Sequence, residues 1–287
     1  MKILYHNDAD GICAAAIVYW FYFNNREGFC FSRDDAMALD YHCDKGFDFN
    51  VDLIDAGESV YLLDFSFNPD VFKRLLLKTE DVIWIDHHQS AIDQVKNNSD
   101  IDLNLGAVDG ILLSGKAACE LTWNYFYKDS LPRAVATIAD YDLGKFNTEN
   151  EAFNAGVMLH YSDPQNSDWE QLLQDSRFVF DAIVKTGSNV IEVQKRSYVD
   201  ILQNWSFSVE FEGLDCLACN THILKSQLFD SINGEFDVFM PFNFNGKQYR
   251  VELRTRRDDL DLCAIAMKYG GGGHRKAAGF MVDRLPF

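Results

Sequence analysis

Residues 82–91 have the sequence VIWIDHHQSA, in which an apolar run leads directly into one aspartate and two histidines. Four consecutive β-branched or aromatic residues predict a short strand that is buried on both faces. The preceding stretch PDVFKRLLLK, residues 69–78, has a helical pattern with proline at its start. A helix followed by a buried strand is typical of parallel sheets, so we expect Asp86, His87 and His88 at the carboxyl end of one strand.

The rest of the first half repeats this alternation. Residues 2–6 (KILYH) and 59–65 (SVYLLDF) have the length and composition of strands. Helical patterns cover residues 12–23, 115–127 and 131–142. Strands that alternate with helices predict an α/β domain with a doubly wound, mainly parallel sheet.

The second half has a different pattern. A long, mostly uninterrupted helical stretch over residues 168–205 is expected to connect two domains. Beyond it, strands are predicted at 207–211, 216–220, 237–244 and 248–255, and Asn245-Gly246 is a hairpin signal between the last two. We therefore predict a catalytic domain over 1–185, a helical connector over 186–205 and a smaller α+β domain over 206–287, with the active site in the cleft between the domains.

Composition and charge limit the class of protein. A hydrophobic fraction of 47% with 23 Phe and only five Pro indicates compact globular domains. A net charge of −18 argues against binding to long duplex nucleic acid, which normally needs a basic surface, but allows a small anionic ligand where cations offset the charge. The N-terminus lacks a signal-peptide core and no long apolar run follows, so we expect a cytoplasmic protein without membrane contact.

The cysteines do not suggest a disulfide framework. Seven Cys, an odd number, are scattered along the chain, so reduced thiols are expected. Cys216 and Cys219 form a CxxC without a second pair, and this favours strand residues over a zinc site.

Carboxylates and imidazoles follow three of the predicted strands. The carboxyl ends of parallel strands share one edge of the sheet, so these groups would converge there. Taken one at a time, each group has a purely structural explanation: a turn residue, a helix cap or a hydrogen-bonded polar side chain. Together they would repel one another unless cations bind, and mixed carboxylate and imidazole ligands suit Mn²⁺, with Mg²⁺, Co²⁺ or Fe²⁺ as alternatives. The candidates are His6, Asp8 and Asp10 after the first strand, Asp64, Asp86 to His88, and Asp140 and Asp142 after a helix.

Five segments resemble a known family. HNDADG, LLDFS, IDHH and ADYDLGKF are similar, in this order, to the four motifs of the DHH phosphoesterases, and GGGGHRKAAGF is similar to the Gly-Gly-Gly-His motif of the DHH-associated C-terminal domain. The subgroup that the chain resembles most is the nanoRNases, which are oligoribonucleases. One departure is the compact His-x-Asp-x-Asp of the first motif, where many members place the His further from the first Asp.

The resemblance implies a site with two Mn²⁺ ions. Asp86 would orient the neighbouring imidazoles, and His88 would face the scissile phosphate as a charge stabiliser or proton donor. The implied metal ligands are His6 and Asp8 for one ion, Asp10, His87 and Asp142 for the other, with Asp140 as the alternative to Asp142, and Asp64 as the bridge.

The C-terminal motif is predicted to bind phosphate. A glycine-rich turn between a helix and a strand explains the glycines alone, but not the cationic side chains beside them. The resemblance implies that Arg254 contacts a substrate phosphate. The predicted cradle consists of Arg254, Gly271, Gly272, Gly273, His274 and Arg275.

The predicted function is a Mn²⁺-dependent phosphodiesterase that releases mononucleotides from very short oligonucleotides or linear dinucleotides by two-metal hydroxide attack. Alternatives with the same chemistry are a phosphatase of 3′-phosphoadenosine 5′-phosphate, a cyclic dinucleotide hydrolase and an exopolyphosphatase-like enzyme. A non-catalytic nucleotide-binding module is the alternative from another class. The sequence leaves a homodimer open.

Overall fold

The computed structural model describes residues 1–40, 49–97, 108–223, 226–229, 232 and 234–287. The chain divides into two compact units, Met1–Ile191 and Glu192–Phe287. The division falls within one long helix, α8 (Arg177–Trp205).

The first unit contains a parallel sheet of five strands in the order β2-β1-β3-β4-β5. The strands are β1 (Lys2–His6), β2 (Ala36–Leu39), β3 (Val60–Leu63), β4 (Val82–Asp86) and β5 (Val108–Leu112). All neighbouring strands run parallel, which confirms the predicted α/β fold. The strand order reverses between β1 and β3, and in open parallel sheets such a reversal opens a crevice at the carboxyl ends.

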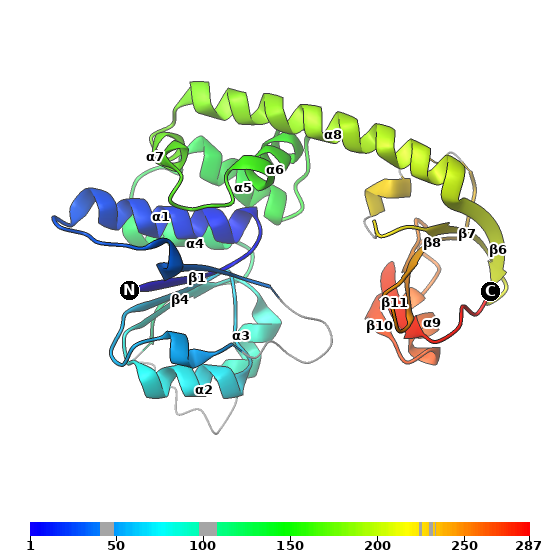
Figure 1. Ribbon diagram of the computed structural model, residues 1–287, viewed down its shortest axis with the longest axis horizontal. Coiled ribbons are helices and arrows are strands. Elements are labelled where there is room, and N and C mark those ends of the chain that lie inside the picture. Colours follow the sequence, from blue (N-terminus) through cyan, green and yellow to red (C-terminus); the bar gives the residue numbers. More distant parts are fainter. Residues whose placement is uncertain (41–48, 98–107, 224–225, 230–231, 233) are drawn as a thin grey trace. The chain divides into compact units, whose positions relative to one another are not determined.

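Helices cover both faces of this sheet (Figure 1). One face carries α1 and α4 with the helices that follow, and the other carries α2 and α3.

Among the described helices, none is both long enough and apolar enough to cross a membrane. Their bounds are α1 (Ala9–Asn25), α2 (Pro69–Lys78), α3 (Gln89–Lys96), α4 (Ala118–Phe126), α5 (Arg133–Asp142), α6 (Thr148–His160) and α7 (Ser167–Leu173). Short 3-10 turns are η1 (Arg33–Asp35), η2 (Val51–Leu53) and η3 (Ser226–Phe229).

Strand β4 shows why the apolar runs are continuous. Ile83 and Ile85 pack in the core shared with α1, whereas Val82 and Trp84 pack with α2 and α3. Successive side chains of a strand point to opposite faces, so a strand between two layers of helices needs apolar residues at every position. All of β4, including Asp86 at its end, is buried.

The helical stretch predicted over 168–205 ends at Trp205 as expected, but a short break after Leu173 divides it into α7 and α8. Asp175 lies between α7 and α8 with a φ of 59°, a left-handed conformation that ends a helix. Its carboxylate accepts a hydrogen bond of 2.7 Å from the backbone N–H of Arg133 at the start of α5. The break therefore coincides with a contact to a distant segment, which the hydrophobic periodicity does not reveal.

The second unit contains a mixed sheet of six strands in the order β10-β11-β9-β8-β7-β6. Its elements are β6 (Ser206–Phe211), β7 (Leu214–Asn220), β8 (Val238–Phe244), β9 (Tyr249–Arg254), α9 (Leu262–Lys268), β10 (Gly272–His274) and β11 (Ala277–Val282). The predicted hairpin is confirmed, because β8 and β9 are antiparallel and Asn245 accepts backbone hydrogen bonds from Lys247 and Gln248.

The cysteines of the CxxC are strand residues, as predicted. Cys216 and Cys219 lie on β7 and are buried. The cysteines within the described residues are free thiols, and Cys43 lies outside the described residues.

Helices α6 and α8 approach closely through two glycines. A Cβ on Gly187 would lie 1.7 Å from the carbonyl oxygen of Ala152, and one on Gly156 would lie 2.4 Å from the carbonyl oxygen of Ile183. Both obstacles are backbone atoms, which cannot move aside as a flexible side chain can. The crossing therefore requires glycine at both positions.

We expect Gly187→Ala to destabilise the first unit by about 1 kcal/mol net, because overpacking against backbone typically costs 1–3 kcal/mol. The better helix propensity of Ala, worth about 1 kcal/mol, would offset only part of this. Thermal unfolding followed by circular dichroism measures the effect. Ser188→Ala is the control, since Ser188 is the exposed neighbour on the same helix and its replacement should change little. Equal stability of the two variants would contradict the close crossing.

Candidate metal centre

The turn between β1 and α1 places the first two candidate ligands. Asp8 caps α1, because its Oδ1 accepts a hydrogen bond of 3.0 Å from the backbone N–H of Gly11. A Cβ at Gly11 would lie 2.2 Å from the carbonyl oxygen of His6, so only glycine lets the helix begin this close to the strand. In this turn Nδ1 of His6 lies 2.9 Å from Oδ2 of Asp8.

Asp10 is fixed by the start of α4. Its two carboxylate oxygens accept hydrogen bonds of 2.7 Å from the backbone N–H groups of Ala118 and Cys119. These donors would otherwise be unsatisfied at a helix N-terminus, where a negative charge is also favoured. Burial and the nearby charge of Asp64 nevertheless raise the pKa of Asp10 to about 7. The local sequence pattern around residues 118 and 119 does not predict that the start of α4 binds Asp10.

Asp64 follows β3 and lies between two imidazoles. Its side chain is 1% exposed, and its backbone has a φ of 54°, which is unusual for a residue other than glycine. Its Oδ2 lies 3.5 Å from Nδ1 of His6, and its Oδ1 lies 3.1 Å from Nε2 of His87. Burial raises the pKa of Asp64. Such backbone strain tends to occur at functional sites, and here it directs one carboxylate toward both histidines.

Asp86 is buried at the end of β4 and holds His88. Its Oδ1 lies 2.8 Å from Nδ1 of His88 and accepts the backbone N–H groups of His87 and His88. The hydroxyl of Ser66 donates to its other oxygen. Burial alone would raise the pKa of Asp86, but these hydrogen bonds outweigh it and lower that pKa. Asp86 is therefore an anionic anchor for His88, and Ser66 is a contributor that the sequence analysis missed.

His87 connects the remaining candidates. Its Nε2 lies 3.5 Å from Oδ2 of Asp142, the last residue of α5, and 3.8 Å from Oδ2 of Asp10. Asp140 is directed elsewhere, since it forms an ion pair of 2.9 Å with Lys145 and its side chain is 51% exposed. Of the two alternatives in the fourth motif, the structure places Asp142 in the cluster.

The candidate ligands form overlapping groups that can hold metal ions. Within each group, ligand atoms lie within 4.8 Å of one another. The groups are His6 with Asp8 and Asp64, Asp10 with His87 and Asp142, and Asp64 with Asp86, His87 and His88. Asp64 belongs to the first group and lies beside His87 of the second, so the structure brings all six predicted ligands together.

The buried atoms of this cluster fit a cation. Within the described part of the chain, both oxygens of Asp64, Nε2 of His87 and Oδ2 of Asp142 are buried without a hydrogen-bond partner. Leaving a polar atom buried and unsatisfied costs about 1–3 kcal/mol. Burial raises the pKa of Asp142 to about 6. Burial alone would lower the pKa of His87, but the neighbouring carboxylates have the larger combined effect and raise the pKa of His87 to about 9. Divalent cations would satisfy these atoms and keep the carboxylates ionised.

The predicted phosphate cradle lies on the sheet of the second unit. Its glycines belong to a hairpin instead of a flexible turn, since β10 pairs with β11. His274 and Arg254 are both opposite Ala277, one on each neighbouring strand, so both side chains point to the same face of the sheet. His274 and Arg275 are exposed, and Arg254 forms an ion pair of 3.1 Å with Glu252.

Strand pairing explains two of the glycines. A Cβ on Gly271 would lie 2.1 Å from the carbonyl oxygen of Gly279, and one on Gly273 would lie 2.6 Å from that of Ala277. A Cβ on Gly272, in contrast, would meet nothing within 4 Å. Close approach of this segment to β11 therefore accounts for Gly271 and Gly273, but not for Gly272.

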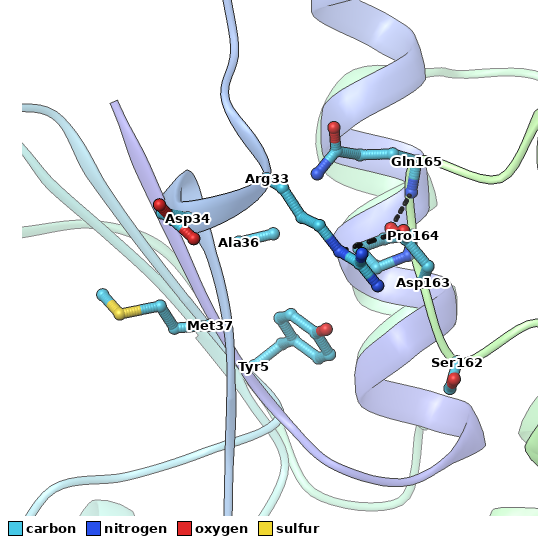
Figure 2. A pocket seen from close by; sticks show the side chains of 9 residues that line it. All are labelled: Tyr5, Arg33, Asp34, Ala36, Met37, Ser162, Asp163, Pro164 and Gln165. Atoms are coloured by element: carbon cyan, nitrogen blue, oxygen red, sulfur yellow. Dashed lines mark hydrogen bonds and ion pairs between the residues drawn. The ribbon is translucent and has the colours of Figure 1, made fainter.

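A separate pocket of about 350 Å³ lies near strand β2 (Figure 2). Arg33 and Asp163 approach each other across it at 3.8 Å, and Asp163 also accepts the backbone N–H of Gln165. The residues that line this pocket include none of the candidate metal ligands. A pocket is a common first candidate for a ligand site, but the buried carboxylates and imidazoles of this chain lie outside this one.

Comparison with known proteins agrees with the arrangement of the first unit. Residues 2–141 match the DHH family, N-terminal domain. An uncharacterized protein of Acanthamoeba polyphaga mimivirus is 25% identical over 294 residues, which is 96% of this chain and 66% of the relative. The chain thus spans about two thirds of that relative's length.

Two solved structures have a similar fold. The DHH domain of a member of the s1p family of ribosomal proteins matches with a TM-score of 0.54 and 14% identity, over 98% of this chain and 82% of that one. RecJ from Thermus thermophilus, solved in complex with Mn²⁺, matches with a TM-score of 0.51 and 11% identity, over 98% of this chain and 49% of that one. The fold of the chain is therefore similar to the folds of these two proteins.

We expect Asp142→Ala to weaken Mn²⁺ binding by at least about tenfold, because it removes a buried anionic ligand atom. Asp140→Ala is the matched control and should leave the affinity within about twofold, since Asp140 is exposed and paired with Lys145. Isothermal titration calorimetry of the whole chain measures both. An equal loss in the two variants, or a larger loss for Asp140→Ala, would show that the fourth motif uses the other carboxylate.

Proposed function

We propose that the chain is a DHH-type phosphodiesterase that depends on Mn²⁺ and hydrolyses very short oligonucleotides or linear dinucleotides to mononucleotides. The observation that carries the proposal is the position of Asp64, buried between His6 and His87 and within reach of two groups of metal-ligating side chains. The match of residues 2–141 to the DHH family supports it. A single ion would not need all six of these ligand groups.

Six residues would hold the two ions: His6 and Asp8 one, Asp10, His87 and Asp142 the other, and Asp64 both. Mixed carboxylate and imidazole ligands, without a thiolate among them, favour Mn²⁺ over softer metals. The chemistry that such a pair of ions supplies, when bound, is charge withdrawal from the phosphoryl group and activation of water.

His88 is the proposed proton donor to the leaving oxygen. The hydrogen bond from Nδ1 of His88 to Asp86 fixes the ring and leaves Nε2 on its opposite side. This same hydrogen bond is the main cause that raises the pKa of His88, so the imidazole is more readily protonated near neutral pH. Asp86 can support this role because Ser66 and two backbone N–H groups hold it in place.

The second unit is proposed to bind a phosphate of the substrate. Arg254 and His274 project from one face of its sheet and supply cationic or donor groups to an anion. The absence of a Cβ at Gly272 would let an anion approach the backbone there, since nothing lies within 4 Å of that position. A phosphate clamp on a chain of net charge −18 suits a small nucleotide better than a long duplex.

A substrate panel tests the proposal. With Mn²⁺, we expect the whole chain to hydrolyse dinucleotides faster than 3′-phosphoadenosine 5′-phosphate, cyclic dinucleotides, pyrophosphate or polyphosphate. Asp64→Asn should lower kcat by at least about a thousandfold, because it removes the charge placed between the two groups, whereas Asp140→Asn should retain activity. Full activity of Asp64→Asn would contradict the proposed centre. A different preferred substrate would assign the same chemistry to another compound, and binding without turnover would favour a nucleotide-binding module.

Arg254 allows a separate test of the phosphate clamp. We expect Arg254→Ala to raise KM for a dinucleotide with a terminal phosphate by about tenfold or more, because a charged hydrogen bond to phosphate contributes roughly 1.5–3 kcal/mol. The matched control is Arg250→Ala on the same strand, which also removes an ion pair with Glu252. Steady-state kinetics with and without the terminal phosphate measure the difference. Equal effects of the two variants would indicate a merely structural role for Arg254.

A further inference from the structure

Two aromatic side chains lie close along the chain to Asp142, a ligand of the candidate metal centre. Phe146, between α5 and α6, is 63% exposed. Its ring lies 5.2 Å from that of Tyr141, centre to centre, with 67° between the ring planes. Tyr141 directly precedes Asp142, which lies 3.5 Å from His87 in the metal cluster. A short segment of chain thus joins the aromatic pair to a ligand of the candidate metal centre.

The backbone around Phe146 is held on both sides. The N–H of Lys145 donates to the carbonyl of Asp140 over 2.8 Å, and the side chain of Asn150 donates to the carbonyl of Lys145, also over 2.8 Å. Asn147 then caps α6 by accepting the backbone N–H of Asn150. The exposed ring therefore projects from a fixed turn, and binding a ligand there would cost little further ordering.

Space is available next to the pair. Gly144 has a φ of 75°, and a Cβ at this position would meet nothing within 4 Å. Phe146 is four residues from Asp142, so their Cα atoms are at most about 15 Å apart. This limit keeps the backbone of Phe146 in the neighbourhood of Asp142.

We propose that Tyr141 and Phe146 form a stacking site for the nucleobase attached to the reacting phosphate. The inference rests on the proposed phosphodiesterase function and deepens it by locating a base-binding site. A nucleobase has the flat apolar face that an exposed ring can cover, and the phosphate linked to it is the group that the metal centre would bind. Stacking accepts any base, so this site contributes affinity without strong base preference.

Kinetics with two substrates test the site: a linear diadenosine dinucleotide and an analogue in which hydrogen replaces both bases. Stacking contributes about 1–3 kcal/mol per base, so Phe146→Ala should raise KM for the dinucleotide by roughly 5- to 100-fold with kcat within about twofold. The same variant should leave kcat/KM for the abasic analogue unchanged. Phe146→Trp should restore the low KM, and Phe146→Leu, which keeps an apolar side chain without a ring face, should not.

Phe178→Ala is the matched control, because Phe178 is 85% exposed on α8 and lies outside the centre. It should behave like the wild type with both substrates. If the wild type hydrolyses the dinucleotide and Phe146→Ala changes neither substrate, or changes both equally, the stacking site is wrong while the proposed function stands. If the wild type hydrolyses neither substrate with Mn²⁺, the proposed function fails, and the stacking site fails with it.

Discussion

The mutual repulsion of buried carboxylates is the constraint on which the centre depends. Asp10 and Asp64 are almost completely buried, and burial raises the pKa of both. Three groups of the chain offset the negative charge of these carboxylates. The N-terminus of α4 donates hydrogen bonds to Asp10, and the imidazoles of His6 and His87 lie beside Asp64. These groups do not satisfy the carboxylates fully, because the Asp64 oxygens lack hydrogen bonds from the described residues. Divalent cations would supply the remaining positive charge.

The parallel sheet makes this concentration of charge possible. Strands β1, β3 and β4 are neighbours with carboxyl ends at one edge, so His6, Asp64 and His87 come from different parts of the sequence to one place. Apolar residues on both faces of the strands bind the sheet to its two helical layers. Apolar packing along the strands thus offsets the free-energy cost of burying charged groups at the strand ends.

The sequence predicted those features that depend on local patterns or on strand ends. Apolar runs located β1, β3 and β4, and the strand-end rule brought their polar residues together. It could not predict contacts that depend on tertiary geometry. Ser66 reaches Asp86, the start of α4 reaches Asp10, and Asp175, at the break between α7 and α8, accepts a hydrogen bond from the start of α5. The choice of Asp142 over Asp140 also depends on which face of α5 meets His87.

The glycine-rich motif of the second unit contains glycines that packing requires and one that it does not. Gly271 and Gly273 are needed because a side chain would collide with strand β11, and this steric requirement exists whether or not an anion binds. Gly272 has no such requirement, since a Cβ there would meet nothing. A glycine without a packing reason, beside exposed His274 and in register with Arg254, is therefore the residue of this motif that phosphate binding explains best. The packing glycines let this segment lie close to β11, and the lack of a Cβ at Gly272 is the feature on which the proposed phosphate site depends.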